Sequence, residues 1–187
     1  MNIVPFLSTH IATFANHIGK TTAIIPELRE ISEKIMVASS LGKKVVLVGN
    51  GGSAAIASHV SVDFVKVANV RAINFNEADL LTCFSNDFGY EMAFAKAIEF
   101  YLDEGDVMVA VSSSGQSENI VNACKAAREQ GASWIVTLTG MDGNNPVRVL
   151  GDSNLWLEEG KYNHIENTHQ FWLLTIVDLI EMQRKGS

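Results

Sequence analysis

The chain opens with two amphipathic helical patterns before any strand-like run. Apolar side chains recur every three or four positions in residues 4–18 and again in 26–40, where Pro26 suits a first helical turn. The recurring residues are Leu7, Ile11, Phe14 and Ile18 in the first segment and Leu28, Ile31, Ile35 and Ala38 in the second. A small sheet cannot easily cover both stripes. We therefore expect these helices to pack on a neighbouring subunit, which predicts oligomerisation.

From residue 43 onward, short apolar runs alternate with helical patterns. The candidate strands are 45–48, 107–111 and 134–138, with weaker ones at 71–75 and, as a possible edge strand, 154–157. The helical patterns cover 53–66, 78–84, 90–102, 117–130 and 164–184. Uniformly apolar strands alternating with helices predict an α/β fold, with a parallel sheet covered by helices on both faces. Ligands of such sheets bind beyond the carboxyl ends of the strands.

Composition narrows the possible partners. A length of 187 residues with 47% hydrophobic residues fits one globular domain with a sizeable core. The net charge of −7 argues against a nucleic-acid partner or an anionic membrane surface. No apolar run is long enough to cross a membrane, and the first residues lack the positive charge of a secretory signal. Cys83 and Cys124 are too few for a disulfide framework; Cys124 fits a core position, and we expect a cytoplasmic protein.

Two of the predicted strands end in turns rich in glycine and serine. Residues 49–53 read Gly-Asn-Gly-Gly-Ser and residues 112–117 read Ser-Ser-Ser-Gly-Gln-Ser, and a helical pattern follows each turn. Unpaired backbone N–H groups and the positive end of the helix dipole make such a turn an anion site. Two of them in one small domain predict a phosphorylated ligand held from two sides.

Each turn also has a purely structural interpretation. The first has neither the dinucleotide-binding spacing nor a Walker A loop, so its glycines could simply ease close packing of strand and helix. The second could be a helix N-cap. One cap needs one hydroxyl, however, and Ser112, Ser114 and Ser117 together exceed that need.

Titratable side chains follow on two of the predicted helices. His59 and Asp63 are four residues apart and share a helix face after the first turn. Such a pair can transfer protons, bind a metal or form an ordinary surface hydrogen bond, and the spacing leaves all three open. The last helix offers His164, Glu166 and His169, which are equally typical of a polar helix start.

A polar stretch at residues 86–90 is expected to form a turn. Asn86 and Asp87 lead it, and they could cap a helix that begins near Glu91. Asp87 is more typical of a capping residue than of a catalytic one, although a ligand hydroxyl could reach it.

Taken in order along the chain, these motifs resemble the sugar isomerase (SIS) domain family, and within it the phosphoheptose isomerases that act on sedoheptulose 7-phosphate. The matching segments are 49–53 with His59, then 85–89, 104–107, 112–117 and 138–143. The resemblance implies a three-layer sandwich with a five-stranded parallel sheet, preceded by two N-terminal helices. It implies one SIS domain over residues 1–187, with 1–42 for oligomerisation and 43–187 as the phosphosugar-binding core. A homotetramer with active sites between subunits is implied as well.

The resemblance also implies a chemistry and a set of residues. The residues expected to bind the sugar phosphate are Gly51, Gly52, Ser53, His59, Asn86, Asp87, Ser112, Ser113, Ser114, Ser117 and Glu166. The implied reaction is aldose–ketose isomerisation through an enediol. Asp63 would move the proton between adjacent carbons, while His59, Glu166 or His169 would polarise the carbonyl or supply the second proton. Some members bind zinc, for which His59, Asp63 and Glu166 would be the ligands here.

Three positions depart from the family pattern. Asp63 stands where the family has glutamate, Glu166 where it has glutamine, and Leu174 where it has a histidine that acts as acid/base and metal ligand. His169 is the nearest substitute, yet it lies about 140° around the helix from residue 174. A second hypothesis is therefore a noncatalytic phosphosugar-binding protein that serves as an adaptor or regulator.

Overall fold

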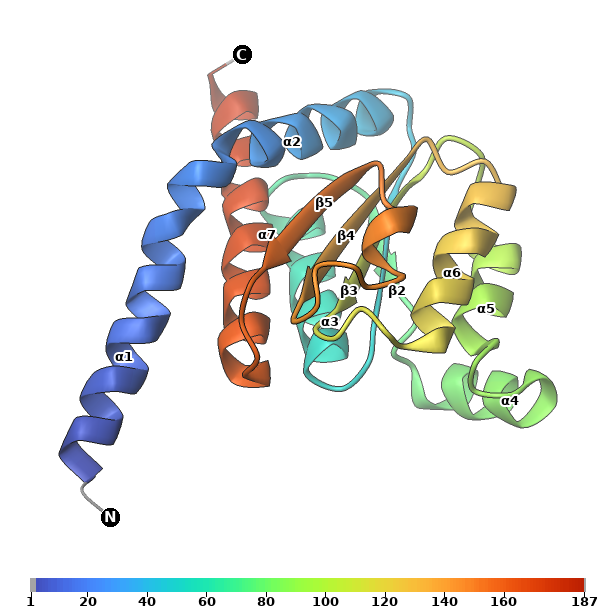
Figure 1. Cartoon of the computed structure of the whole chain (residues 1–187). Coiled ribbons are helices and arrows are strands. Elements are labelled where there is room, and N and C mark those ends of the chain that lie inside the picture. The colour runs from blue at the N-terminus through green and yellow to red at the C-terminus, as the bar shows by residue number, and fades with distance from the viewer. Residues whose placement is uncertain (1–2, 187) are drawn as a thin grey trace.

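The computed structural model describes residues 3–186, whose strands form one five-stranded parallel sheet in the order β2-β1-β3-β4-β5 (Figure 1). The strands are β1 (Val45–Gly49), β2 (Ala72–Asn74), β3 (Val107–Ser112), β4 (Trp134–Gly140) and β5 (Ser153–Leu157). All five expected strands are present. Every residue of β1 and β3 is buried, because these central strands are covered on both faces. In β5 buried and half-buried residues alternate, as befits an edge strand.

Helices cover both faces of the sheet. They are α1 (Ile3–Lys20), α2 (Ile25–Ser40), α3 (Gly52–Lys66), α4 (Ala78–Phe88), α5 (Ala93–Tyr101), α6 (Glu118–Glu129) and α7 (Tyr162–Lys185), with short 3₁₀ turns at Thr21–Ile24 and Arg148–Leu150. One apolar cluster joins α2, α3 and α7 to the sheet, and a second joins α5 and α6 to its other face (Figure 1). Within residues 3–186, no helix combines the length and apolar character needed to span a bilayer.

The two N-terminal helices have different surroundings. The apolar stripe of α2, including Ile31 and Ile35, is buried in the chain's own core, so it needs no neighbouring subunit. Helix α1 instead runs along α7 and projects beyond it (Figure 1). The only residue that α1 buries is His17. Its exposed large hydrophobic residues are Ile3, Val4, Phe6, Leu7 and Ile11.

The turn expected at residues 86–90 is not formed as predicted. Asn86 and Asp87 lie in the last turn of α4, which continues to Phe88, and α5 starts at Ala93. Gly89 ends α4: its N–H donates to the carbonyl of Ser85 at 3.1 Å, and its φ of +85° favours glycine. The helix therefore extends through polar residues whose composition alone is typical of a turn.

Candidate functional site

A pocket at the carboxyl ends of the adjacent strands β1 and β3 brings the two turns together. Its volume is about 110 Å³, against roughly 30 Å³ for one water molecule in the liquid. Its lining residues are Asn50, Ser53, Val111, Ser112, Ser113, Ser114, Ser117, Tyr162 and Glu166. Residues of both turns thus line one cavity, Asn50 and Ser53 from the first and the four serines from the second, as the sequence analysis expected. Tyr162, at the start of α7, is a lining residue that the sequence analysis did not identify.

The first turn brings backbone close to the pocket. Gly51 occupies the N-cap position of α3 with a φ of +54°, so no side chain caps the helix. The carboxylate of Glu166 lies so close to Gly52 that any larger residue there would overlap it. The N–H groups of Ser53 and Ala54 already donate to the Asn50 carbonyl, at 2.9 and 3.3 Å, so what this turn offers an anion is the positive end of the α3 dipole.

The second turn leaves serine hydroxyls without protein partners. Ser112 and Ser113 are buried, and neither hydroxyl oxygen has a hydrogen-bond partner among the described residues. Ser117 is the N-cap residue of α6, yet its side chain makes no capping hydrogen bond. A buried hydroxyl without a partner costs about 1–3 kcal/mol. These serines therefore do not serve as side-chain caps, and their role in ligand binding remains a prediction.

A reciprocal amide pair holds the two turns at a fixed spacing. Asn50 Nδ2 donates to Asn119 Oδ1 at 2.8 Å, and Asn119 Nδ2 donates back to Asn50 Oδ1 at 2.9 Å. The hydroxyl of Tyr90 also donates to Asn50 Oδ1, at 2.7 Å. Asn119 is 3% exposed, so this pair is shielded from water. The sequence analysis missed Asn119, because its partner lies in the other turn.

Helices α3 and α7 bring together a second group of polar side chains. His59 Nε2 lies 3.2 Å from Asp63 Oδ2, and His59 Nδ1 lies 3.0 Å from the Gln170 amide nitrogen. An amide N–H can only donate, so the proton of neutral His59 belongs on Nε2, directed at Asp63. Gln170 was not predicted from the sequence. The available signal was its position one helical turn after Glu166, on the same face of α7.

Seven predicted site residues lie outside the pocket lining: Gly51, Gly52, His59, Asp63, Asn86, Asp87 and His169. His169 is fully buried, and its Nε2 donates to the Thr139 carbonyl at 3.1 Å. Burial lowers the pKa of His169 to about 4, which keeps the ring neutral near pH 7. Asn86 and Asp87 are exposed on α4, where the Asn86 amide donates to Asp87 Oδ1 at 2.9 Å. Their roles remain predictions.

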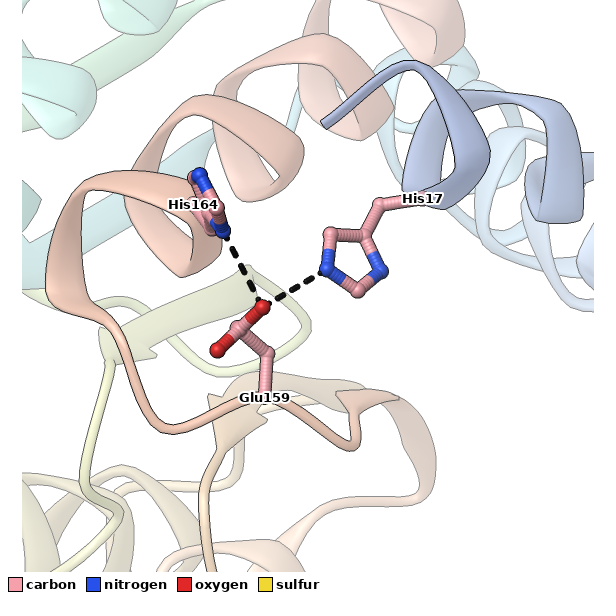
Figure 2. Close-up of side chains that lie close together, drawn as sticks. All are labelled: His17, Glu159 and His164. Carbon is pink, nitrogen blue, oxygen red and sulfur yellow. Dashed lines mark hydrogen bonds and ion pairs between the residues drawn. The ribbon is translucent and has the colours of Figure 1, made fainter. Parts of the chain in front are cut away.

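The residues implied as zinc ligands do not gather in one place. Within residues 3–186, the single group of three acidic, histidine or cysteine side chains with donor atoms within 4.8 Å of one another is His17, Glu159 and His164 (Figure 2). Both nitrogens of His59 face Asp63 and Gln170, and Glu166 does not complete such a group with them. The zinc set of His59, Asp63 and Glu166 remains a prediction.

Comparison with known proteins gives a consistent set of relatives. A family model described as the SIS domain matches residues 11–140. A phosphoheptose isomerase of Clostridium acetobutylicum is 40% identical over 169 residues, which cover 87% of this chain and 85% of the relative. A phosphoheptose isomerase of Aliarcobacter butzleri is 32% identical over 171 residues, with 88% and 89% covered. The structure of a phosphoheptose isomerase from Neisseria gonorrhoeae superposes with a TM-score of 0.87 at 24% identity, covering 97% of this chain and 100% of that one.

Proposed function

This chain belongs to the SIS domain family, and from that premise we propose that it is a phosphosugar isomerase that interconverts sedoheptulose 7-phosphate, or a related sugar phosphate, with its aldose. The observation that carries the proposal is the unpartnered pair of buried hydroxyls, Ser112 and Ser113, in a pocket that Ser53 at the start of α3 also lines. Such a pocket suits a phosphate group. The adaptor alternative is not favoured, because the named relatives are isomerases.

The dimensions of the site fit a phosphate at one end of a seven-carbon sugar. His59 lies six residues along α3 from Ser53, a rise of about 9 Å. Eight bonds separate the phosphorus of a 7-phosphate from C1, which is about 10 Å in an extended chain. A sugar that extends along α3 from the pocket would therefore present C1 and C2 to His59 and Asp63.

The proposed reaction needs a base at carbon and a proton donor at oxygen. The Asp63 carboxylate takes a proton from C1 of the ketose, while His59 Nε2–H donates to O2, giving the enediol. Asp63 then returns its proton to C2, and His59 recovers a proton from O1 as the aldehyde forms. Atoms and charge balance over the cycle. Gln170 is a positioning residue, because its amide at Nδ1 keeps the proton on Nε2.

The other predicted groups take different parts in this proposal. Glu166 lines the pocket, and we assign to it the sugar hydroxyls between the phosphate and C2. His169 is fully buried and donates a hydrogen bond to the Thr139 carbonyl, so we assign it no direct contact with the substrate. We derive no step through zinc at His59, Asp63 and Glu166, because the donor atoms of His59 face other side chains.

Assembly and location complete the proposal. The exposed apolar residues of α1, among them Phe6 and Ile11, support a homo-oligomer, which we expect to be a tetramer. Cys83 and Cys124 are free thiols, which supports a cytoplasmic setting.

The function is tested by NMR detection of sedoheptulose 7-phosphate turnover. We expect turnover by the wild type and a 10²- to 10⁴-fold lower kcat for Asp63→Asn, the range typical of a lost general base. Asp103→Asn is the matched control, since this carboxylate lies just before β3 at the opposite edge of the sheet and should leave kcat unchanged. Binding of C5 to C7 sugar phosphates without turnover of any of them would reject the isomerase and support the adaptor.

A further inference from the structure

Another polar cluster lies at the C-terminal end of α1, away from the pocket. Glu159 lies in the segment between β5 and α7, and one of its carboxylate oxygens forms hydrogen bonds with two imidazole rings (Figure 2). His17 Nε2 from α1 lies 2.8 Å from Glu159 Oε2, and His164 Nδ1 from α7 lies 3.0 Å from that same atom. Helix α1 and residues 159–164, which are far apart in the sequence, therefore meet at one point.

The donor set and its spacing match a small divalent cation. Two imidazole nitrogens and one carboxylate oxygen are the ligand types that Zn²⁺ prefers. In a tetrahedral site with bonds near 2.0–2.1 Å, ligand atoms are about 3.3 Å apart. The distances of 2.8 and 3.0 Å, with all three atoms within 4.8 Å of one another, require shifts of only a few tenths of an ångström on the two short edges.

Neighbouring groups already orient two of the three ligands. The other carboxylate oxygen of Glu159 accepts hydrogen bonds from the backbone N–H groups of Gly160, at 2.7 Å, and Lys161, at 3.0 Å. His164 Nε2 lies 3.1 Å from His10 Nδ1, so a ring that bound a cation through Nδ1 could donate its remaining proton to His10. Outer partners of this kind fix the ring orientation of metal-binding histidines.

The cluster is also shielded and incomplete, as a metal site with an open position would be. His17 and His164 are 7% and 2% exposed, and the Glu159 side chain is 14% exposed. Three protein ligands leave a fourth position for water.

We propose that His17, Glu159 and His164 bind a divalent cation of the zinc type, which clamps α1 onto the start of α7. The cation replaces two hydrogen bonds with coordination bonds, and each imidazole stays neutral as its proton moves to the other ring nitrogen. The clamp is distinct from the His59–Asp63 pair and does not depend on the proposed isomerase activity. Its effect is on the docking of α1, the helix whose apolar residues remain exposed.

Cobalt titration of the chelator-stripped full-length protein tests the site. We expect the visible absorption of four-coordinate Co²⁺ to saturate at one equivalent per chain, and Zn²⁺ both to displace it and to raise the melting temperature. Glu159→Gln keeps the size and acceptor oxygen of the side chain but removes the charge. It should weaken Co²⁺ binding at least about 100-fold, more than the loss of an outer partner does. Circular dichroism checks that the variant is folded.

A matched histidine substitution separates the two candidate regions. His59→Asn should leave the cobalt titration unchanged, whereas His17→Asn should weaken it as Glu159→Gln does. Loss of cobalt binding in His59→Asn with retention in Glu159→Gln would overturn the proposal. Failure of the stripped wild type to bind Co²⁺ or Zn²⁺ would overturn it too, and would leave the cluster as a hydrogen-bonded contact only.

Discussion

His169 links one buried side chain to the pH dependence of stability. Burial holds its pKa at about 4, below the ordinary value of 6.5. Between these values the unfolded chain binds a proton that the native ring does not, so stability falls as pH falls from 6.5 to 4. We expect this group to remove about 3 kcal/mol of unfolding free energy over that window.

Urea unfolding of the wild type and His169→Gln at pH 6.5, 5.5 and 4.5 measures this contribution. Gln keeps a donor for the Thr139 carbonyl but does not titrate, so the variant should lose stability less steeply with acid. Equal slopes for the two proteins would show that His169 is not the group responsible.

Single residues also show where sequence reasoning reached its limit. Ser112 and Ser53 could be identified as candidate site residues because each stands in a turn rich in glycine and serine, which is visible in the sequence. Asn119 could not, because its partner Asn50 is distant in sequence; the spacing of Gln170 from Glu166 was a signal, but it does not reveal the distant partner His59. The function of an amide side chain cannot be recognised from the sequence when its hydrogen-bond partner is unknown.

At the scale of elements, the amide pair between the two turns invites a direct test. Asn119→Ala removes both reciprocal hydrogen bonds and frees the turns to move independently. We expect about a 10-fold weaker affinity for the sugar phosphate, with a stability loss of about 1–3 kcal/mol. Isothermal titration with sedoheptulose 7-phosphate and urea unfolding measure the two effects separately.

The control for this variant comes from the same helix. Asn122 donates to the Glu91 carbonyl at 3.0 Å and does not line the pocket, so Asn122→Ala should lower stability without changing affinity. If both variants bound the sugar phosphate equally well, the amide pair would not be what sets the spacing of the turns.

The elements themselves were largely predictable, and the exceptions have physical causes. Apolar runs such as 107–111 predict strands because both faces of a central strand must be covered. The polar composition of residues 86–90 predicted a turn, yet α4 continues to Phe88. The helix ends only at Gly89, whose positive φ ends the helical conformation. Local composition was outweighed there by the position of one glycine. The apolar stripe of α2 packs against the sheet of its own chain. The periodicity of its apolar residues predicts a buried helix face but does not say whether the partner is the same chain or a second copy.

At the scale of the whole molecule, the exposed side of α1 predicts how copies of the chain associate. Phe6 and Ile11 are 58% and 65% exposed, an unusual position for large apolar side chains gathered on one helix. Charged residues there should disfavour burial against a second copy. We expect the double variant Phe6→Glu/Ile11→Glu to have a lower mass than the wild type in size-exclusion chromatography with light scattering.

Val149→Glu provides the comparison for this experiment. Val149 is 76% exposed on the 3₁₀ turn Arg148–Leu150, far along the chain from α1, and its substitution should leave the mass unchanged. A wild type that elutes as a monomer would refute the assembly proposal outright.

The open hydroxyls of Ser112 and Ser113 have a practical consequence for anyone who assays this protein. The phosphate site proposed here would not distinguish an esterified oxyanion fully from free inorganic anions, so we expect phosphate or sulfate buffers to act as competitive inhibitors. They would raise the apparent KM and, by mass action, the apparent melting temperature. Kinetic work in a buffer of bulky organic amines would therefore give the truer picture of substrate preference.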